Sequence, residues 1–237
     1  MRNTGIVVLM LFCGVIRAQS VAKVTLIQGS AKILRTSTDQ WKPLKVNMSL
    51  QIGNQLYSDE ESMVEITYSN GEIVRLDENT KIIITHSTAD SVKSKVGIGR
   101  VWVNMKKLSS VGRDFQVETA TAVAAIRGTI FDMTANQDSS AIVSVFDGKV
   151  AVGPTDKLKK QIALEKKYTP VREPQEVPGP EEIPGPFEVS LEQWNLIVAG
   201  QRISIRESGK FMTETFDLSS QDTFVQKNQQ RDKQLGK

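Results

Sequence analysis

The chain of 237 residues has one cysteine and one histidine. A zinc site built from these residue types needs about four ligands, and a histidine-dependent catalytic dyad or triad would have to use His86. The net charge is only +3, and no basic cluster lies beside interleaved aromatics, so a nucleic-acid-binding stripe is excluded. Gly97-Ile98-Gly99 lacks the third glycine and the strand–turn–helix context of a nucleotide-binding loop. The function classes that remain are catalysis by carboxylates alone and binding without catalysis.

The sequence gives no positive sign of an enzyme, a cofactor or a metal site. The acidic run Asp59-Glu60-Glu61 lacks the alternating oxygen ligands and the glycine bend of a calcium loop, so it is interpreted as a solvated turn. His86 ends an isoleucine-rich segment and is interpreted as an ordinary surface or edge residue. An enzyme would need acidic side chains that converge in one cleft. We predict no catalytic, cofactor-binding or metal-binding residues.

Residues 1–18 have the pattern of a secretory signal peptide. Arg2 precedes the apolar run Gly5–Ile16, and Ala18 supplies a small residue at the cleavage position. The run is shorter than the ~20 residues that span a bilayer. An uncleaved anchor helix and a lipoprotein signal at Cys13 are the alternatives, although Phe12 stands where lipoprotein processing prefers a small residue. Cleavage would remove the one cysteine and leave an exported chain without disulfides or a membrane span.

Residues 19–153 are predicted to form an all-β domain. Apolar and polar residues alternate in several short segments, for example Val64–Tyr68 and Phe115–Thr119. Gln28-Gly29-Ser30, Asn70-Gly71 and Asp147-Gly148 each separate two apolar runs and predict hairpins, the last two with type I′ turns. Strands follow one another every 8 to 12 residues or so, without a convincing long helix. An antiparallel-rich β-solenoid or sandwich-like fold is therefore expected.

The composition changes after residue 153. Residues 154–186 hold seven of the eight prolines and predict an extended spacer. Residues 187–218 predict a short helix with Trp194, Ile197 and Val198 on its packing face, ended by Gly200, and then a strand at 202–206. This piece is too short to fold alone and should dock on the β domain or on a partner. Residues 219–237 are polar and predict a disordered tail.

The most distinctive stretch is Thr119–Phe131, a run of small residues followed by Ile126-Arg127-Gly128-Thr129-Ile130-Phe131. Gly128 permits a bend or a close backbone approach, and Arg127 offers several donors to carbonyls or a carboxylate across a turn. Phe131 is expected in the core. We interpret this stretch as a corner of the fold rather than a ligand site.

The glycine turns, the alternating segments and the Thr119–Phe131 stretch, taken in their order along the chain, resemble a FecR domain, the periplasmic module named after the ferric-citrate uptake regulator. The resemblance covers about residues 21–152. Its most specific part is Arg127-Gly128-Thr129 with Phe131, followed about 15 residues later by Asp147-Gly148, and these six residues are identified as a structural family motif. The resemblance implies the fold and an envelope location, and it supplies no catalytic residues.

One departure from that family affects the expected function. Only four residues precede the apolar run, so a cytoplasmic anti-sigma segment has no place and sigma-factor regulation is not carried over. Two hypotheses follow. The protein is an exported, non-enzymatic binding or scaffold module that contacts another envelope protein or a cell-wall or surface component, in the periplasm or at the cell surface. Alternatively, it is the periplasmic sensory component of a cell-surface signalling system that acts through a separate membrane partner.

Overall fold

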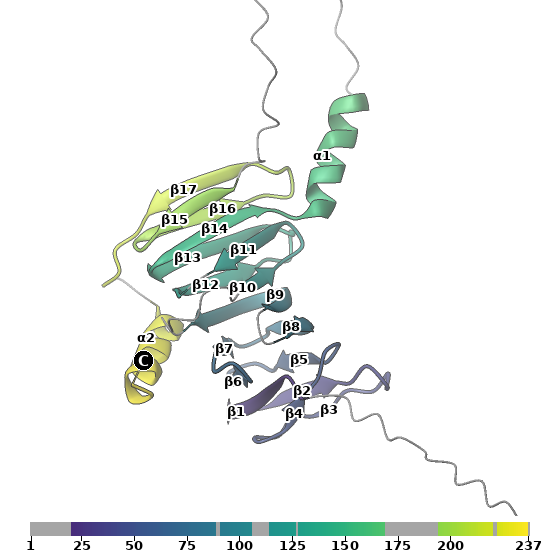
Figure 1. The fold of residues 1–237 in the computed structure, drawn as a ribbon, viewed down its shortest axis with the longest axis vertical. Coiled ribbons are helices and arrows are strands. Elements are labelled where there is room, and N and C mark those ends of the chain that lie inside the picture. The colour runs from purple at the N-terminus through teal and green to yellow at the C-terminus, as the bar shows by residue number, and fades with distance from the viewer. Residues whose placement is uncertain are drawn as a thin grey trace, which may run out of the picture.

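The computed structural model describes residues 20–88, 91–105, 114–126, 128–168, 194–219 and 222–236. Seventeen strands dominate them, and two helices, α1 (Asp156–Tyr168) and α2 (Thr223–Gln234), complete the described elements. The strands are stacked along the long axis of the molecule, with α1 at one end and α2 beside the middle of the stack (Figure 1). The predicted all-β class is confirmed.

The strands, in chain order, are β1 (Ala22–Gln28), β2 (Ala31–Leu34), β3 (Lys42–Pro43), β4 (Ser49–Leu50), β5 (Gln55–Ser58), β6 (Met63–Tyr68), β7 (Ile73–Leu76), β8 (Lys81–Ser87), β9 (Ser91–Asn104), β10 (Asp114–Glu118), β11 (Ala122–Ile126), β12 (Ile130–Ala135), β13 (Ala141–Asp147), β14 (Lys149–Pro154), β15 (Asn195–Val198), β16 (Gln201–Ile205) and β17 (Phe211–Thr215).

Strand pairing divides this open arrangement into two series that share β9. Sheet A runs in the order β4-β1-β6-β7-β9-β12-β13-β16-β17. Sheet B runs in the order β3-β2-β5-β8-β9-β10-β11-β14-β15. Among the described strands every pairing is antiparallel except β9 with β10. The antiparallel-rich prediction is therefore confirmed.

Strand β9 belongs to both sheets because it bends at Gly99. Its first part pairs with β8 and β10, and its last part pairs with β7 and β12. Gly99 has φ +92°, and a methyl group there would lie 2.3 Å from Thr80 Oγ1 and 2.5 Å from Thr80 Cα. Glycine alone fits this position, because the backbone is left-handed and the neighbouring chain is already in contact.

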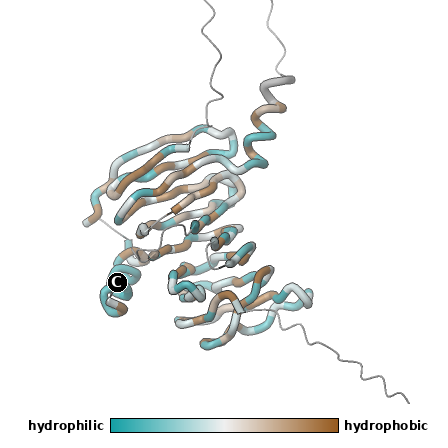
Figure 2. Tube along the Cα trace, in the orientation of Figure 1, coloured by the Kyte–Doolittle hydropathy of each residue, from teal (hydrophilic) through white to brown (hydrophobic). Residues whose placement is uncertain are grey.

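Apolar side chains from both sheets form one continuous core. Tyr68 of β6 in sheet A makes an edge contact with Phe115 of β10 in sheet B, with ring centroids 5.8 Å apart. Its hydroxyl lies 2.6 Å from Ser94 Oγ of β9. Hydrophobic and polar residues alternate along many strands (Figure 2), as period-two side-chain geometry requires. The two-residue period seen in the sequence therefore gives the core face correctly.

Two predicted hairpins are corners between the sheets. β1 and β2 flank Gly29, and β13 and β14 flank Gly148, yet neither pair of strands is hydrogen-bonded, because each pair has one member in sheet A and the other in sheet B. Both glycines have positive φ. A glycine between apolar strands marks a reversal of the chain, but the reversal can lead to the other sheet as well as to the neighbouring strand.

The Asn70-Gly71 hairpin is confirmed, although its turn type is not I′. β6 and β7 pair directly, but Gly71 has a positive φ and Asn70 does not. The Gly71 amide donates to Tyr68 O at 2.8 Å, and the Tyr68 amide donates to Glu72 O at 2.9 Å. This is a three-residue loop with glycine in its left-handed position, which is the next most common hairpin connection.

Three predictions beyond residue 153 need correction. The spacer predicted at 154–186 begins with α1, since the stretch between Pro154 and Pro170 lacks proline and is rich in helix formers. The helix predicted around Trp194 is the strand β15, where pairing with β14 overrides the helical spacing of apolar residues. Residues 169–193 lie outside the described part of the chain, so the proline repeat is not tested.

The segment 194–218 docks on the β domain, which is one of the two docking sites expected for it. Strand β16 confirms the strand expected near 202–206, and it pairs with β13. Ile197, Ile203 and Ile205 belong to the common core. The third correction concerns the predicted disordered tail, because residues 223–234 form α2 with Phe224 and Val225 buried. The side of this helix that contacts the sheet is mostly polar. The segment therefore has a low hydropathy, which indicated disorder in the sequence.

None of the helices in the described residue ranges has the length and apolar character that crossing a membrane requires. The N-terminal apolar run lies outside those ranges.

Candidate protein-binding face on sheet A

A row of polar residues crosses the face of sheet A that points away from the core. Strand register places each member directly opposite the next one in the neighbouring strand, from β6 to β17. Residues opposite each other in adjacent strands share a face of the sheet. The polar row consists of Glu65, Arg75, Trp102, Asp132, Ser144, Arg202 and Glu214.

Most of the polar row lies under other parts of the chain rather than in solvent. Glu65, Arg75, Trp102, Asp132 and Ser144 are all buried. Buried charges are tolerated only when they are paired and hydrogen-bonded. The charged members of the polar row have such partners within the row or on α2, except Asp132, which pairs with Arg100 of β9.

One end of the row is the ion pair between Glu65 and Arg75. Arg75 Nε donates to Glu65 Oε2 at 2.7 Å, and Thr25 Oγ1 donates to Glu65 Oε1 at 2.8 Å. From α2, Asp232 Oδ1 lies 2.7 Å from Arg75 Nη1, and Arg231 Nε donates to Glu65 Oε2 at 3.2 Å. Two acids and two arginines thus form a compact group of balanced charge between the sheet and the helix.

The indole of Trp102 connects this charged group to a small apolar cluster. Its Nε1 donates to Asp232 Oδ2 at 3.0 Å, which satisfies the polar atom of a fully buried ring. The ring packs with Phe224 and Val225 of α2. It also lies 4.7 Å from the ring of Phe146, centroid to centroid. The helix is therefore held by one indole hydrogen bond, a few ion pairs and a modest apolar contact.

Asp222 anchors the N-terminus of α2. Its Oδ1 accepts a hydrogen bond from the Val225 amide at 2.9 Å, as an N-cap does. Its other oxygen pairs with Arg100, which also pairs with Asp132 of the polar row. The Arg100 guanidinium lies 5.1 Å from the centre of the Phe224 ring. Arg100 therefore links the beginning of the helix to the sheet.

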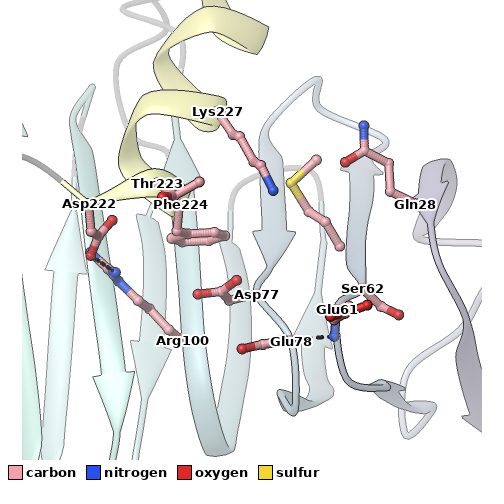
Figure 3. Close-up of a pocket in the computed structure, with 11 residues that line it drawn as sticks. Gln28, Glu61, Ser62, Asp77, Glu78, Arg100, Asp222, Thr223, Phe224 and Lys227 are labelled. Atoms are coloured by element: carbon pink, nitrogen blue, oxygen red, sulfur yellow. Dashed lines mark hydrogen bonds and ion pairs between the residues drawn. The ribbon is translucent and has the colours of Figure 1, made fainter.

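A cavity of 540 Å³ opens beside this anchor, between α2 and the corners of the β-stack. Figure 3 shows Lys227 reaching toward it from α2, while Asp77 and Glu78 approach from the sheet side. With Glu61 and Asp222, four acidic residues line the cavity.

The acids of this cavity do not form an evident catalytic group. Asp222 is engaged as a helix cap, and Glu78 Oε2 accepts from the Glu61 amide at 2.7 Å. Burial raises the pKa of Asp77 above its usual value. Within the described ranges, acidic and histidine side chains form no cluster of three or more that could hold a metal ion. The cavity is lined mostly by polar and charged side chains.

Acidification is expected to loosen α2 before it unfolds the sheets. Burial alone would raise the pKa of Glu65, but hydrogen bonds from Arg231, Arg75 and Thr25 outweigh burial and lower it. The pKa of Asp222 is likewise lowered, because the Val225 amide and Arg100 outweigh its desolvation. Both carboxylates therefore stabilise the fold fully above about pH 4–5, and the contribution is lost as pH falls through their lowered folded-state pKa values.

Amide hydrogen exchange at pH 7 and at about pH 3, corrected for intrinsic rates, tests this expectation. Protection of α2 amides should fall more than that of β6 or β12. Acid has the opposite effect at Asp132, because burial raises the pKa of this carboxyl despite the nearby Arg100. Protonation of Asp132 removes the cost of burying its charge and offsets part of the stability lost at Glu65 and Asp222. Equal loss of protection in helix and sheet would contradict the prediction.

The residues of the structural family motif lie away from the polar row, at two adjoining corners between the sheets. A methyl group on Gly148 would lie 3.0 Å from Gly128 O, so the two corners are in contact. Thr129 Oγ1 donates to Lys149 O at 2.8 Å, and Asp147 lies opposite Ile130 in register. Phe131 is buried in the core. Arg127 lies outside the described residues, and the structural role of the motif stays a prediction.

Sequence reasoning did not find the polar row. Glu65 was interpreted as lying on a solvent-facing side of its strand, and Arg75, Asp132 and Asp232 carried no local signal. The residues lie on elements that are far apart in the chain, and only the strand register brings them together. Asp222, three residues before Val225, is a type of residue that caps helix N-termini, and it is the one local signal that could have indicated the start of this helix.

Residues 54–151 match the family described as FecR protein. The match spans β5 to the first half of β14 and includes the polar row from Glu65 to Ser144, whereas α2 lies outside it. The resemblance to FecR domains is thus confirmed over these residues. No curated protein matches the chain.

Two solved structures are similar to part of the chain. They are crystal structures, at 1.65 Å and 2.50 Å resolution, of a putative anti-sigma factor from Parabacteroides distasonis. Each has 18% sequence identity and a TM-score of 0.48 and covers 70% of this chain. This chain spans 61% of the length of those structures.

Proposed function

We propose that this protein is an exported, non-enzymatic regulatory module of the bacterial cell envelope that acts by binding another protein. The observation that carries the proposal is the FecR match at residues 54–151. It favours the signalling hypothesis, in which the protein is a sensory component that works through a separate membrane partner. The polar face of sheet A adds support, because its charges are organised for recognition of a polypeptide segment.

Export is the first requirement of this function. The apolar run Gly5–Ile16 and the small residue Ala18 predict cleavage by a signal peptidase. Mass spectrometry of the protein isolated from its native cells should show a chain that starts at Gln19 or within a residue or two. A cytoplasmic protein that keeps Met1 would contradict the proposal, and a lipid-modified Cys13 would favour the lipoprotein alternative.

Identification of the partner tests the function itself. The tagged full chain, crosslinked in intact cells and recovered from solubilised envelopes, is expected to capture a membrane protein reproducibly. Bait that has been heat-unfolded is the control. Recovery of a cell-wall or surface component instead of a membrane protein would favour the scaffold hypothesis. Failure to capture either under crosslinking would argue against a binding function.

We also propose a finer architecture than the all-β class. Contacts of Tyr68 with Phe115 and Ser94 support a sandwich-like packing of sheet A on sheet B, with chain crossings at the glycine corners. The domain boundaries stay as proposed, with the FecR-like unit at 19–153 and the additional segment at 187–218. The shared core residues Ile197, Ile203 and Ile205 indicate that this segment stabilises the unit.

A further inference from the structure

We propose that the polar face of sheet A is a receptor for an amphipathic helix of a partner protein, and that α2 is its internal, replaceable occupant. This inference rests on the proposed function, since it names the surface and the kind of partner segment that would bind. The surface lies over β6, β7, β9 and β12, and Figure 1 shows α2 beside this part of the stack.

The contacts of α2 define what the receptor recognises. Phe224, Asn228 and Asp232 are spaced four residues apart and therefore lie on one stripe of the helix. Phe224 meets Trp102, Asn228 Oδ1 accepts from Arg75 Nη1 at 3.3 Å, and Asp232 Oδ2 accepts from Trp102 Nε1. The matching segment is thus a helix with an aromatic residue, a carboxamide four residues later and a carboxylate eight residues later.

Charge complementarity restricts the partner further. Arg231 of α2 pairs with the buried Glu65, while Asp232 pairs with the buried Arg75. An occupant therefore needs an Arg-Asp pair in this order at the far end of its stripe. A purely apolar helix would leave two desolvated charges without their second partners, which disfavours it.

Three observations indicate that α2 can be replaced. First, Glu65 and Arg75 pair with each other at 2.7 Å, so the sheet keeps its own ion pair when the helix leaves. Second, the buried apolar side chains of α2 are few, Phe224 and Val225, and most residues of the helix are hydrophilic (Figure 2). Third, Arg75 Nη2 is buried and has no hydrogen-bond partner among the described residues, so α2 does not satisfy the receptor completely.

The position of α2 in the chain agrees with its being replaceable by a partner helix. The helix follows the edge strand β17 and lies outside the residues that match the FecR family. The surface that it covers lies largely inside that match. Elements with few buried apolar contacts open at low free-energy cost. A competing helix therefore meets a surface that becomes free without unfolding of the sheets.

A labelled peptide offered in trans tests the proposal. The peptide has residues 222–236 with fluorescein at its N-terminus, and the full chain is used as wild type and as Phe224→Ala. The linked helix competes with the peptide at an effective concentration in the millimolar range. We expect the peptide to bind the Phe224→Ala protein at least tenfold more tightly than wild type, by fluorescence anisotropy. A peptide carrying Asp232→Ala is the matched control and should bind at least tenfold more weakly than the unaltered peptide.

Hydrogen exchange on the same proteins separates the outcomes. In Phe224→Ala the α2 amides should exchange faster than in wild type, with β6 and β12 unchanged. If α2 stays as protected as the sheet, or is released but the peptide still does not bind, the proposal is wrong. Equal binding of the control peptide would also contradict it. A concentration-dependent dimer of the wild type that Phe224→Ala abolishes would assign the surface to a second copy and overturn the partner assignment.

Comparison with the envelope capture keeps this inference distinct from the proposed function. Phe224→Ala bait should recover at least threefold more partner than wild type. Equal recovery of the same partner would leave the proposed function intact and reject the helix receptor. Peptide binding without any captured envelope protein would reject the proposed function and retain the surface as a helix-binding face.

Discussion

Replacing Arg75 with alanine is expected to destabilise the protein by about 3–5 kcal/mol, the usual cost of removing one partner from a buried ion pair. Arg75 is fully buried and lies 2.7 Å from both Glu65 Oε2 and Asp232 Oδ1. Its removal leaves two desolvated carboxylates, with Arg231 as the remaining cation that pairs with Glu65. The free energy of unfolding from urea denaturation of the full chain provides the measurement.

Lys95→Ala is the matched control for Arg75→Ala. Lys95 lies in sheet B and pairs with Glu118 at 3.8 Å, and both side chains are more than two-fifths exposed. Solvent screens such a pair, so the expected loss is at most about 1 kcal/mol. Similar losses for the two variants would show that α2 and the polar row do not keep Arg75 and its partners away from water.

Replacing Gly99 with alanine is expected to cost about 2–5 kcal/mol. A left-handed backbone conformation costs a non-glycine residue roughly 1–2 kcal/mol, and an overpacked site adds about 1–3 kcal/mol. The new methyl group would lie 2.5 Å from Thr80 Cα, a backbone atom that cannot rotate away. Because β9 passes from one sheet to the other here, the strain affects β7, β8, β10 and β12 together.

Gly71→Ala separates backbone strain from steric overlap. Gly71 also has a positive φ, +86°, but a methyl group there meets no atom within 4 Å. Its replacement should therefore cost about 1–2 kcal/mol, the backbone term alone. Urea denaturation of both variants measures the difference. Equal costs at the two positions would indicate that Thr80 moves aside and that the bend in β9 tolerates a side chain.

Much of the β-structure could be predicted from local patterns. Alternation marks β6 and β10, and the isoleucines of residues 82–84 mark β8. A strand exposes alternate side chains to opposite faces, so one buried face leaves a two-residue period in the sequence. The FecR resemblance rested on the same kind of local information, and the family match confirms it.

The sequence predicted less well those elements whose structure depends on contacts with another element of the fold. Trp194, Ile197 and Val198 have helical spacing, yet β14 was available for pairing, and residues 195–198 form β15 instead. The polar residues of α2 indicated disorder because their partners, Glu65 and Arg75, are more than 150 residues away in the chain. Single-sequence reasoning has no access to such long-range compensation of charge.

The sequence by itself determined the β-class, the positions of the turns, and the glycines at which the chain reverses, because these features follow from side-chain period and backbone sterics within a few residues. Only the tertiary structure decided which reversals are hairpins and which are corners, since that depends on the sheet to which the following strand pairs. It also decided that Glu65, Arg75, Trp102 and Asp132 form one row. Buried charges are stable only beside their counter-charges, and strand register places those counter-charges.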